Sequence, residues 1–218
     1  MDTRKLIAEA VGTFILVGMG SLAILSTGAI VGSPLLVVVP LGFGLGLLAA
    51  IAIAGHVSGG HFNPAVTLGA FLDKRIDAMN AAGYVVAQVV GAVVASAMIL
   101  ALSDKTAVAG TKNMPGAAGD GGAFLVEVVL TAIFIAVILT VTKKDAGHAL
   151  VVIPLTLLAI HVAGIPFSGA SVNPARALGP AIVSLDFAAI WIYLTAPFIG
   201  AVVGWLVYRV LAPEEQGA

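Results

Sequence analysis

Two short stretches combine residue types that are unusual in an apolar chain. The stretch HFNPAVTL begins at His61 and SVNPARAL begins at Ser171, so Asn-Pro-Ala occurs once in each half of the chain. An Asn side chain can cap a helix with its oxygen and still offer N–H donors, and Pro is favoured at the first helical position. Each motif therefore predicts a helix start that carries donors, and the repetition indicates a site built from two equivalent halves. The motif residues are Asn63, Pro64, Ala65, Asn173, Pro174 and Ala175.

The composition indicates that the lipid bilayer is the natural solvent of this chain. Of its 218 residues, 60% are hydrophobic and only 10% are charged, and the mean hydropathy is +1.13. Soluble domains are about 25% charged. The net charge of −1 argues against a nucleic-acid partner, and the absence of cysteine excludes disulfides and thiolate chemistry. We expect no cofactor and no bound metal.

Six apolar runs are long enough to cross a bilayer as helices, which takes about 20 mostly apolar residues. The basic N-terminus and first apolar run resemble a signal peptide, but the run is long and contains Glu9, so we interpret it as a retained span. The predicted spans are 6–25, 35–54, 78–102, 122–141, 149–165 and 188–211.

Two shorter apolar segments, 64–72 and 174–184, begin at the Pro of each repeated motif. At 1.5 Å rise per residue, each predicted helix is about 15 Å long, half of the ~30 Å hydrocarbon core. A helix that starts at mid-membrane is tolerated only where protein or a watery cavity satisfies its free backbone groups. One half-helix in each half of the chain therefore indicates a substrate pathway at the centre of an inverted repeat.

The basic residues predict the orientation of the chain. With the N-terminus inside, six spans place only Lys105 and Lys112 outside, while Arg176 lies within the membrane region. The positive-inside tendency thus predicts a multi-pass protein of the plasma (cell inner) membrane with both termini in the cytoplasm. The basic residues placed on the cytoplasmic side are Arg4, Lys5, Lys74, Arg75, Lys143, Lys144 and Arg209, and the tail PEEQGA is expected to be solvated.

Each half also carries one acid in its first span, Glu9 and Glu127. A buried acid could relay protons, as in transporters, or accept hydrogen bonds from the backbone of the adjacent broken loop. We favour the second role, because each half has one acid and one broken loop. The halves, about 1–102 and 122–218, are joined by the polar segment 103–121, which we interpret as an external connector within a single channel domain of residues 1–218.

Together these features resemble the aquaporin or major intrinsic protein family. The stretches SGGHFNPAVTLG and SGASVNPARALGPA are similar to its two signature loops, and the Glu in the first span of each half also matches. The resemblance covers essentially the whole chain. It implies an all-α membrane protein, an inverted repeat of six tilted transmembrane helices plus two re-entrant half-helices that meet end to end, with a pore in each monomer of a homotetramer.

The resemblance also implies which residues line the pore. A selectivity constriction on the outer side would fall on Phe43, His161, Ala170 and Arg176. Arg176 would repel cations and donate hydrogen bonds, and a cation buried in the membrane region is costly and usually functional. By itself, His161 could equally be an ordinary buried histidine. The implied ladder of backbone carbonyls comes from Gly59, Gly60, His61 and Phe62 in one half and from Gly169, Ala170, Ser171 and Val172 in the other.

We therefore predict a passive channel that conducts water in single file and excludes protons and ions. Facing half-helix N-termini would create a positive centre that opposes cations. By resemblance, His161, Ala177, Ala181 and Tyr193 are typical of the water-selective branch, whereas Leu194 and the small Ala170 depart from it. The alternative function is a facilitator of glycerol or another small neutral solute.

Three other interpretations fit the sequence less well. The two Asn could be helix caps only, but a cap alone does not need to be repeated at membrane depth. A proton-coupled transporter would need titratable groups in its pathway, and the mid-membrane acids are Glu9 and Glu127 alone. An intramembrane enzyme would need a nucleophile, an aspartate pair or a metal-ligand cluster, and none is evident, so we expect that the protein is not an enzyme.

Overall fold

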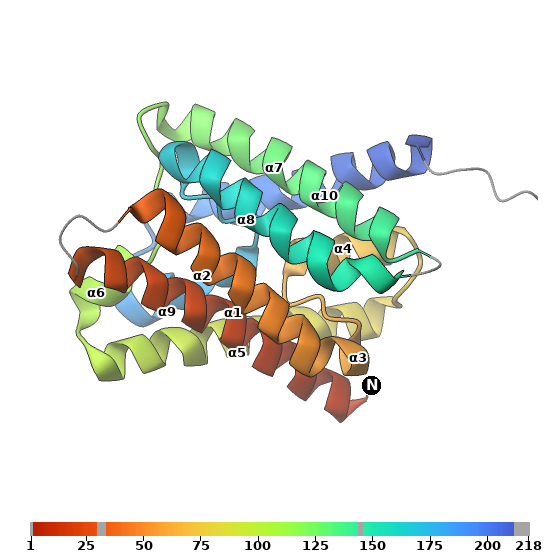
Figure 1. The fold of residues 1–218 in the computed structure, drawn as a ribbon, viewed down its shortest axis with the longest axis horizontal. Coiled ribbons are helices and arrows are strands. Elements are labelled where there is room, and N and C mark those ends of the chain that lie inside the picture. Colours follow the sequence, from red (N-terminus) through yellow and green to blue (C-terminus); the bar gives the residue numbers. More distant parts are fainter. Residues whose placement is uncertain (1, 30–33, 144–145, 212–218) are drawn as a thin grey trace, which may run out of the picture.

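The computed structural model describes residues 2–29, 34–143 and 146–211, and these residues form helices and turns without a strand (Figure 1). Lys144 and the tail beyond residue 211, both used in the sequence analysis, lie outside the described residues. Six of the described helices are long and apolar enough to span a membrane. They are α1 (Thr3–Ala29), α2 (Leu35–Ala50) with the helical turns that continue it to Ser58, α5 (Ala78–Leu102), α7 (Gly119–Val141), α8 (Ala149–Ser168) and α10 (Ile190–Leu211).

Two half-helices, α4 (Pro64–Leu72) and α9 (Pro174–Ser184), have the predicted bounds. The long helices differ from the prediction mainly at their ends, where hydropathy is a weak guide to hydrogen bonding. Helix α2 continues through a π-helical turn (Ile51–Gly55) into the short α3 (His56–Ser58), and a 3-10 turn (Ala146–His148) precedes α8.

One helix, α6 (Lys105–Gly110), was not predicted and lies inside the polar connector. Its N-cap is Asp104, whose side chain accepts a hydrogen bond from the backbone N–H of Ala107 at 2.8 Å. This favourable cap compensates for a helix that is too short to be stable alone. The connector is therefore folded against the bundle, and Val108 and Thr111 within it are buried.

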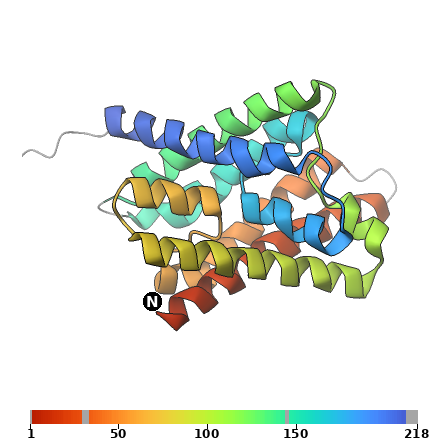
Figure 2. The ribbon, with the colours of Figure 1, turned by 180° about the vertical axis from the view of Figure 1, so that it is seen from behind.

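The packing of the helices follows an internal repeat in which α1, α2, α4 and α5 correspond to α7, α8, α9 and α10. Helix α1 packs on α2 and α5, and α7 packs on α8 and α10 in the same way. Helix α9 packs on α5 and α4 packs on α10, so each half-helix lies against the last long helix of the other half (Figure 2). Neither half could therefore bury its own short helix alone.

Close approach of the long helices depends on glycine. An added Cβ at Gly204 of α10 would lie 2.4 Å from the carbonyl oxygen of Ala132 in α7, and one at Gly91 of α5 would lie 2.2 Å from that of Ala10 in α1. These contacts bring the backbones together, as small residues do in membrane bundles.

The start of α1 and the end of α10 lie at the same end of the molecule, and α6 lies at the opposite end (Figure 1). The half-helices α4 and α9 occupy opposite ends of the bundle and point toward its middle in both views (Figures 1 and 2). The two Asn-Pro-Ala motifs therefore approach each other at half the depth of the bundle.

Candidate functional site

Each half-helix begins with an Asn cap and a Pro. The Oδ1 atom of Asn63 accepts a hydrogen bond from the N–H of Ala65 at 2.8 Å. In the second half, Oδ1 of Asn173 accepts hydrogen bonds from the N–H groups of Ala175 and Arg176 at 3.0 and 3.2 Å. Both Asn backbones are extended and both side chains are 3% exposed. The preceding side chain thus satisfies one free N–H group at the start of α4 and two at the start of α9.

The amide nitrogens of the two Asn connect the halves to each other. Nδ2 of Asn63 donates to the carbonyl oxygen of Val172 at 2.8 Å, and Nδ2 of Asn173 donates to that of Phe62 at 3.0 Å. Each Asn therefore holds the residue before the other Asn. The two amides were predicted to offer N–H donors, but this bond between the halves was not predicted, because it has no signature in the sequence. Each Nδ2 still has a second N–H beyond this bond.

Glu9 and Glu127 hold the backbone that precedes each Asn. Glu127 is fully buried and accepts hydrogen bonds from the N–H groups of Ser171 and Val172, both at 2.7 Å, and from Oγ of Ser168 at 2.7 Å. The corresponding bonds to buried Glu9 come from His61 N, Phe62 N and Ser58 Oγ, at 2.9, 2.7 and 2.6 Å.

These bonds stabilise an unusual backbone. Phe62, Ala170 and Val172 have φ values of 50°, 51° and 44°, in the left-handed region that residues with a side chain rarely adopt. Such a backbone cannot satisfy its own N–H groups, so a buried carboxylate on the neighbouring helix replaces the missing partners. Tyr84 and Tyr193 add an equivalent contact in each half, because their hydroxyls donate to the carbonyls of Ser58 and Ser168.

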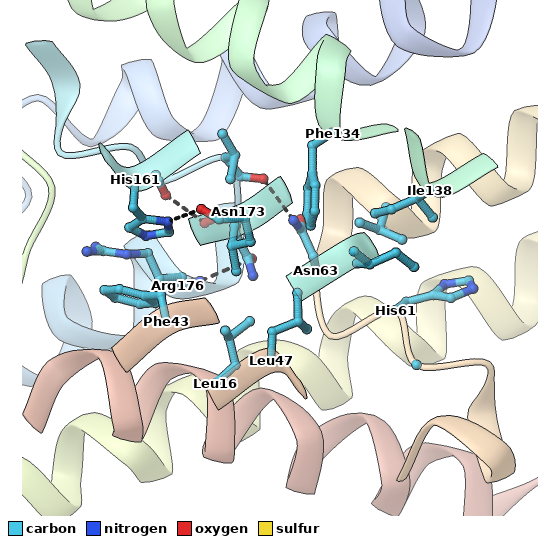
Figure 3. Close-up of a pocket in the computed structure, with 16 residues that line it drawn as sticks. Leu16, Phe43, Leu47, His61, Asn63, Phe134, Ile138, His161, Asn173 and Arg176 are labelled. Atoms are coloured by element: carbon cyan, nitrogen blue, oxygen red, sulfur yellow. Dashed lines mark hydrogen bonds between the residues drawn. The ribbon is translucent and has the colours of Figure 1, made fainter. Parts of the chain in front are cut away.

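A narrow cavity passes beside the two Asn and has two chemically different sides (Figure 3). Its volume, counted as the space that the centre of a water molecule can occupy, is about 20 Å³, which is enough for about one water. The apolar side is formed by Leu16, Leu47, Val66, Phe134, Ile138, Ile153 and Leu157. The polar side is formed by Gly60, His61, Asn63, Ser171, Val172, Asn173 and Arg176.

Four of the predicted pore residues do not line this cavity. They are Gly59, Phe62, Gly169 and Ala170. The carbonyls of Phe62 and Gly169 accept hydrogen bonds from Asn173 and Asn113, so amide donors already occupy them. Ala170 is fully buried, and its Cβ lies against Gly164 of α8. The predicted constriction residue Ala170 thus lies next to the cavity wall and not on its surface.

The three other predicted constriction residues lie together at one end of the cavity. The rings of Phe43 and His161 are stacked with centroids 4.4 Å apart, and the guanidinium carbon of Arg176 lies 4.9 Å from the centroid of Phe43. All three are at most 4% exposed. His61 lies at the other end of the cavity, and Asn63 and Asn173 lie between (Figure 3).

The hydrogen bonds of His161 define which atom faces the cavity. Its Nδ1 lies 2.9 Å from the carbonyl oxygen of Leu157, and a carbonyl can only accept, so Nδ1 carries the proton. In the neutral ring Nε2 is then an acceptor. Within the described residues, Nε2 of His161 and Nε of Arg176 have no hydrogen-bond partner. This end of the cavity thus combines a free acceptor with a cationic donor.

His61 connects the narrow cavity to a wider one. It lines both the narrow cavity and a space of about 680 Å³ that is also lined by Lys5, Lys74, Arg75 and Asp77. Its Nδ1 lies 3.1 Å from Oγ1 of Thr67. The wider space lies at the end of the bundle where α1 begins, and it forms a vestibule with basic walls.

Asn113, which was not predicted, contacts a constriction residue from its place in the connector and is 3% exposed. Its Oδ1 accepts a hydrogen bond from Nη1 of Arg176, and its Nδ2 donates to the carbonyl of Gly169. Nothing in the local sequence TKNMPG marks this role, because the contact depends on how the connector folds back onto the bundle.

The comparison with protein families decides the classification. A sequence model described as Major intrinsic protein matches residues 1–208. The chain belongs to the major intrinsic protein family. Members of this family are channels and not enzymes. The six long helices and two half-helices of this major intrinsic protein agree with the aquaporin fold.

Relatives of this major intrinsic protein carry two kinds of name. It is 39% identical to Aquaporin Z of Rhodopseudomonas palustris, over all of this chain and 97% of the relative. It is 38% identical to the glycerol uptake facilitator protein-like 6 of Lactiplantibacillus plantarum, over 97% of this chain and all of the relative. Among solved structures, the aquaglyceroporin of Plasmodium falciparum is similar with a TM-score of 0.84 and 27% identity, covering 96% of each chain.

Proposed function

We propose that this major intrinsic protein is a passive water channel that conducts water in single file and excludes protons and ions. The observation that carries the proposal is the constriction of Phe43, His161 and Arg176 at the end of a cavity with room for about one water. A water there can accept a hydrogen bond from Arg176 and donate one to Nε2 of His161. A small constriction with polar groups favours water over a solute with a carbon chain.

The two Asn support the exclusion of protons. Each half-helix N-terminus carries roughly half a positive elementary charge, and both point at the middle of the pore. The second N–H of Asn63 and Asn173 is available to the oxygen of a passing water. That water would direct its own hydrogens away from the Asn pair, toward both mouths, which interrupts the chain of hydrogen bonds that a proton needs. Arg176 adds a second barrier to cations.

The apolar side of the cavity supports fast conduction. Leu47, Phe134 and Leu157 offer no hydrogen bonds to water, so a water is held only from the polar side. Gly60, His61 and Ser171 lie in the cavity wall, where their carbonyls supply acceptors along the path. Weak holding at several sites allows a molecule to leave as readily as it enters.

The oligomeric state, membrane and orientation of the channel are also part of the proposal. We propose that the channel is a homotetramer in the plasma membrane with both termini in the cytoplasm. The common end shared by the start of α1 and the end of α10 supports the placement of the termini (Figure 1). Lys74 and Arg75 lie at the mouth of the vestibule at that end, in agreement with the positive-inside tendency.

A facilitator of glycerol is the second candidate, and the named relatives favour it as much as they favour water. The experiment that separates the two is stopped-flow light scattering of proteoliposomes that contain the wild-type protein. We expect water permeability well above that of empty vesicles and glycerol permeability equal to theirs. Glycerol flux above the empty-vesicle level would establish the second candidate instead, and water flux at that level would contradict the first.

A further inference from the structure

The connector between the two halves contacts Arg176 of the constriction. Thr111 and Asn113, which follow α6, are 2% and 3% exposed, although the segment is among the most polar in the chain. Nη1 of Arg176 donates to the carbonyl oxygen of Thr111 at 3.3 Å and to Oδ1 of Asn113. Within the described residues these are the only hydrogen bonds that the guanidinium makes.

Asn113 also holds the loop on the other side of Arg176. Its Nδ2 donates at 3.0 Å to the carbonyl of Gly169, the left-handed cap that ends α8 and begins the broken loop. An added Cβ at Gly169 would lie 3.0 Å from that same nitrogen, so the contact is close. One amide group thus joins Arg176, on α9, to the loop that precedes α9.

The position of Asn113 is itself fixed by its neighbours in the connector. Lys112 is almost fully buried and forms an ion pair of 2.5 Å with Asp186 in the turn between α9 and α10. The N–H of Gly116 donates to the carbonyl of Phe167 at 2.8 Å. These contacts on both sides hold the connector against the mouth of the pore, so Asn113 has a fixed place from which to hold Arg176.

We propose that Asn113 is a positioning residue that determines specificity, because it sets where the Arg176 guanidinium stands in the constriction. The proposal rests on the proposed function. Without Asn113, Arg176 would keep a single long hydrogen bond to Thr111 and its contact with the Phe43 ring. A long side chain held by so little adopts other rotamers, and the constriction then widens on the side that Arg176 closes.

Two substitutions of Asn113 separate the effect of the position of Arg176 from the effect of the charge beside it. Asn113→Ala removes both hydrogen bonds and leaves Arg176 free to move. Asn113→Asp keeps an oxygen that accepts from Arg176 but adds a negative charge beside the guanidinium, which lowers its barrier to cations. Lys105→Ala is the matched control, because Lys105 is an exposed residue of α6 in the same connector.

The experiment measures water flux, glycerol flux and proton leak in proteoliposomes with equal amounts of each variant. For Asn113→Ala we expect water flux within about twofold of wild type and glycerol flux about tenfold above the empty-vesicle level, at which wild type is expected to lie. For Asn113→Asp we expect glycerol to stay excluded while proton leak rises. Lys105→Ala should match wild type in all three.

Unchanged ratios of glycerol to water and unchanged proton exclusion in both Asn113 variants would overturn the inference while leaving the channel function in place. An equal fall of every flux, with a lower thermal midpoint, would also overturn it, because that is the signature of a loop anchor without a role in selection. If Asn113→Ala does not insert into the vesicle membrane, the proton leak of Asn113→Asp tests the inference, and a leak equal to that of wild type would overturn it. A wild type that conducts no water would overturn the proposed function and this inference together.

Discussion

Arg176, His161 and Phe43 form one unit at the scale of single residues. Phe43 stacks on His161 and lies beneath the guanidinium of Arg176, so its ring fixes both polar groups at once. The bond from Nδ1 of His161 to Leu157 keeps Nε2 as an acceptor. The size and polarity of this end of the cavity therefore depend on three side chains from α2, α8 and α9.

Removing side chains from this unit should widen the constriction and allow glycerol to pass. With Phe43→Ala and His161→Gly combined, we expect glycerol flux in proteoliposomes to rise from the empty-vesicle level of the wild type to at least about tenfold above that level. The physical reason is that two walls of the constriction are removed while Arg176 and both Asn stay. Val162→Ala, at an exposed position next to His161 on α8, is the control and should not change it. A folded double variant that still excludes glycerol would place the selective step elsewhere.

At the scale of the elements, the half-helices depend on partners from the opposite half. Helix α4 packs on α10 and α9 packs on α5. The loops that precede them are held by Glu9 on α1 and Glu127 on α7. Buried carboxylates and exchanged helices together supply the hydrogen bonds and packing that a broken helix lacks inside a membrane.

The contact between α7 and α10 provides a direct test of this packing. Gly204→Ala should lower the thermal midpoint of the detergent-solubilised protein by roughly 3–10 °C, because the added methyl would meet the Ala132 carbonyl and overpacking costs about 1–3 kcal/mol.

The matched control for this test is Gly28→Ala in α1, where an added Cβ has no neighbour within 4 Å. For Gly28→Ala we expect no fall in the thermal midpoint, and even a small rise, because Ala is a better helix former than Gly. Equal midpoints for the two variants would show that α7 and α10 separate at little cost.

At the scale of the whole molecule, the connector joins parts that are distant in the sequence. Lys112 pairs with Asp186 near the start of α10, and Asn113 reaches α9. The Lys112 ammonium beside the carboxylate holds the pKa of Asp186 below its ordinary value, with a smaller contribution from the N–H of Ala188. The ion pair therefore contributes to stability above the ordinary pKa of an aspartate, about 4, and this contribution is lost as the pH falls through the lower pKa of the folded state.

The dependence of the thermal midpoint on pH should thus show whether the Lys112–Asp186 ion pair stabilises the fold. Between about pH 5 and pH 3 we expect the thermal midpoint of the wild type to fall more steeply than that of Asp186→Asn, which has no proton to take up. Lys112→Met, which removes the cause of the lowered pKa, should show the same shallower dependence. Parallel curves for all three proteins would show that the pair does not stabilise the fold.

The sequence by itself determined much of this protein. Hydropathy placed six spans, and the Asn-Pro pairs marked the first residues of α4 and α9, because capping and the missing N–H of Pro are local effects. The repeated motifs and the two acids indicated the family and its all-helical membrane fold.

Only the tertiary structure decided how these parts meet. The bonds from Asn63 to Val172 and from Asn173 to Phe62, the fold of α6, and the reach of Asn113 to Arg176 join residues that are far apart in the chain. Such contacts follow from the path of the backbone through the bundle and from which hydrogen-bond partners burial leaves available. Local sequence patterns predict neither the backbone path nor these partners, because the same polar residues could form hydrogen bonds with water on an exposed loop.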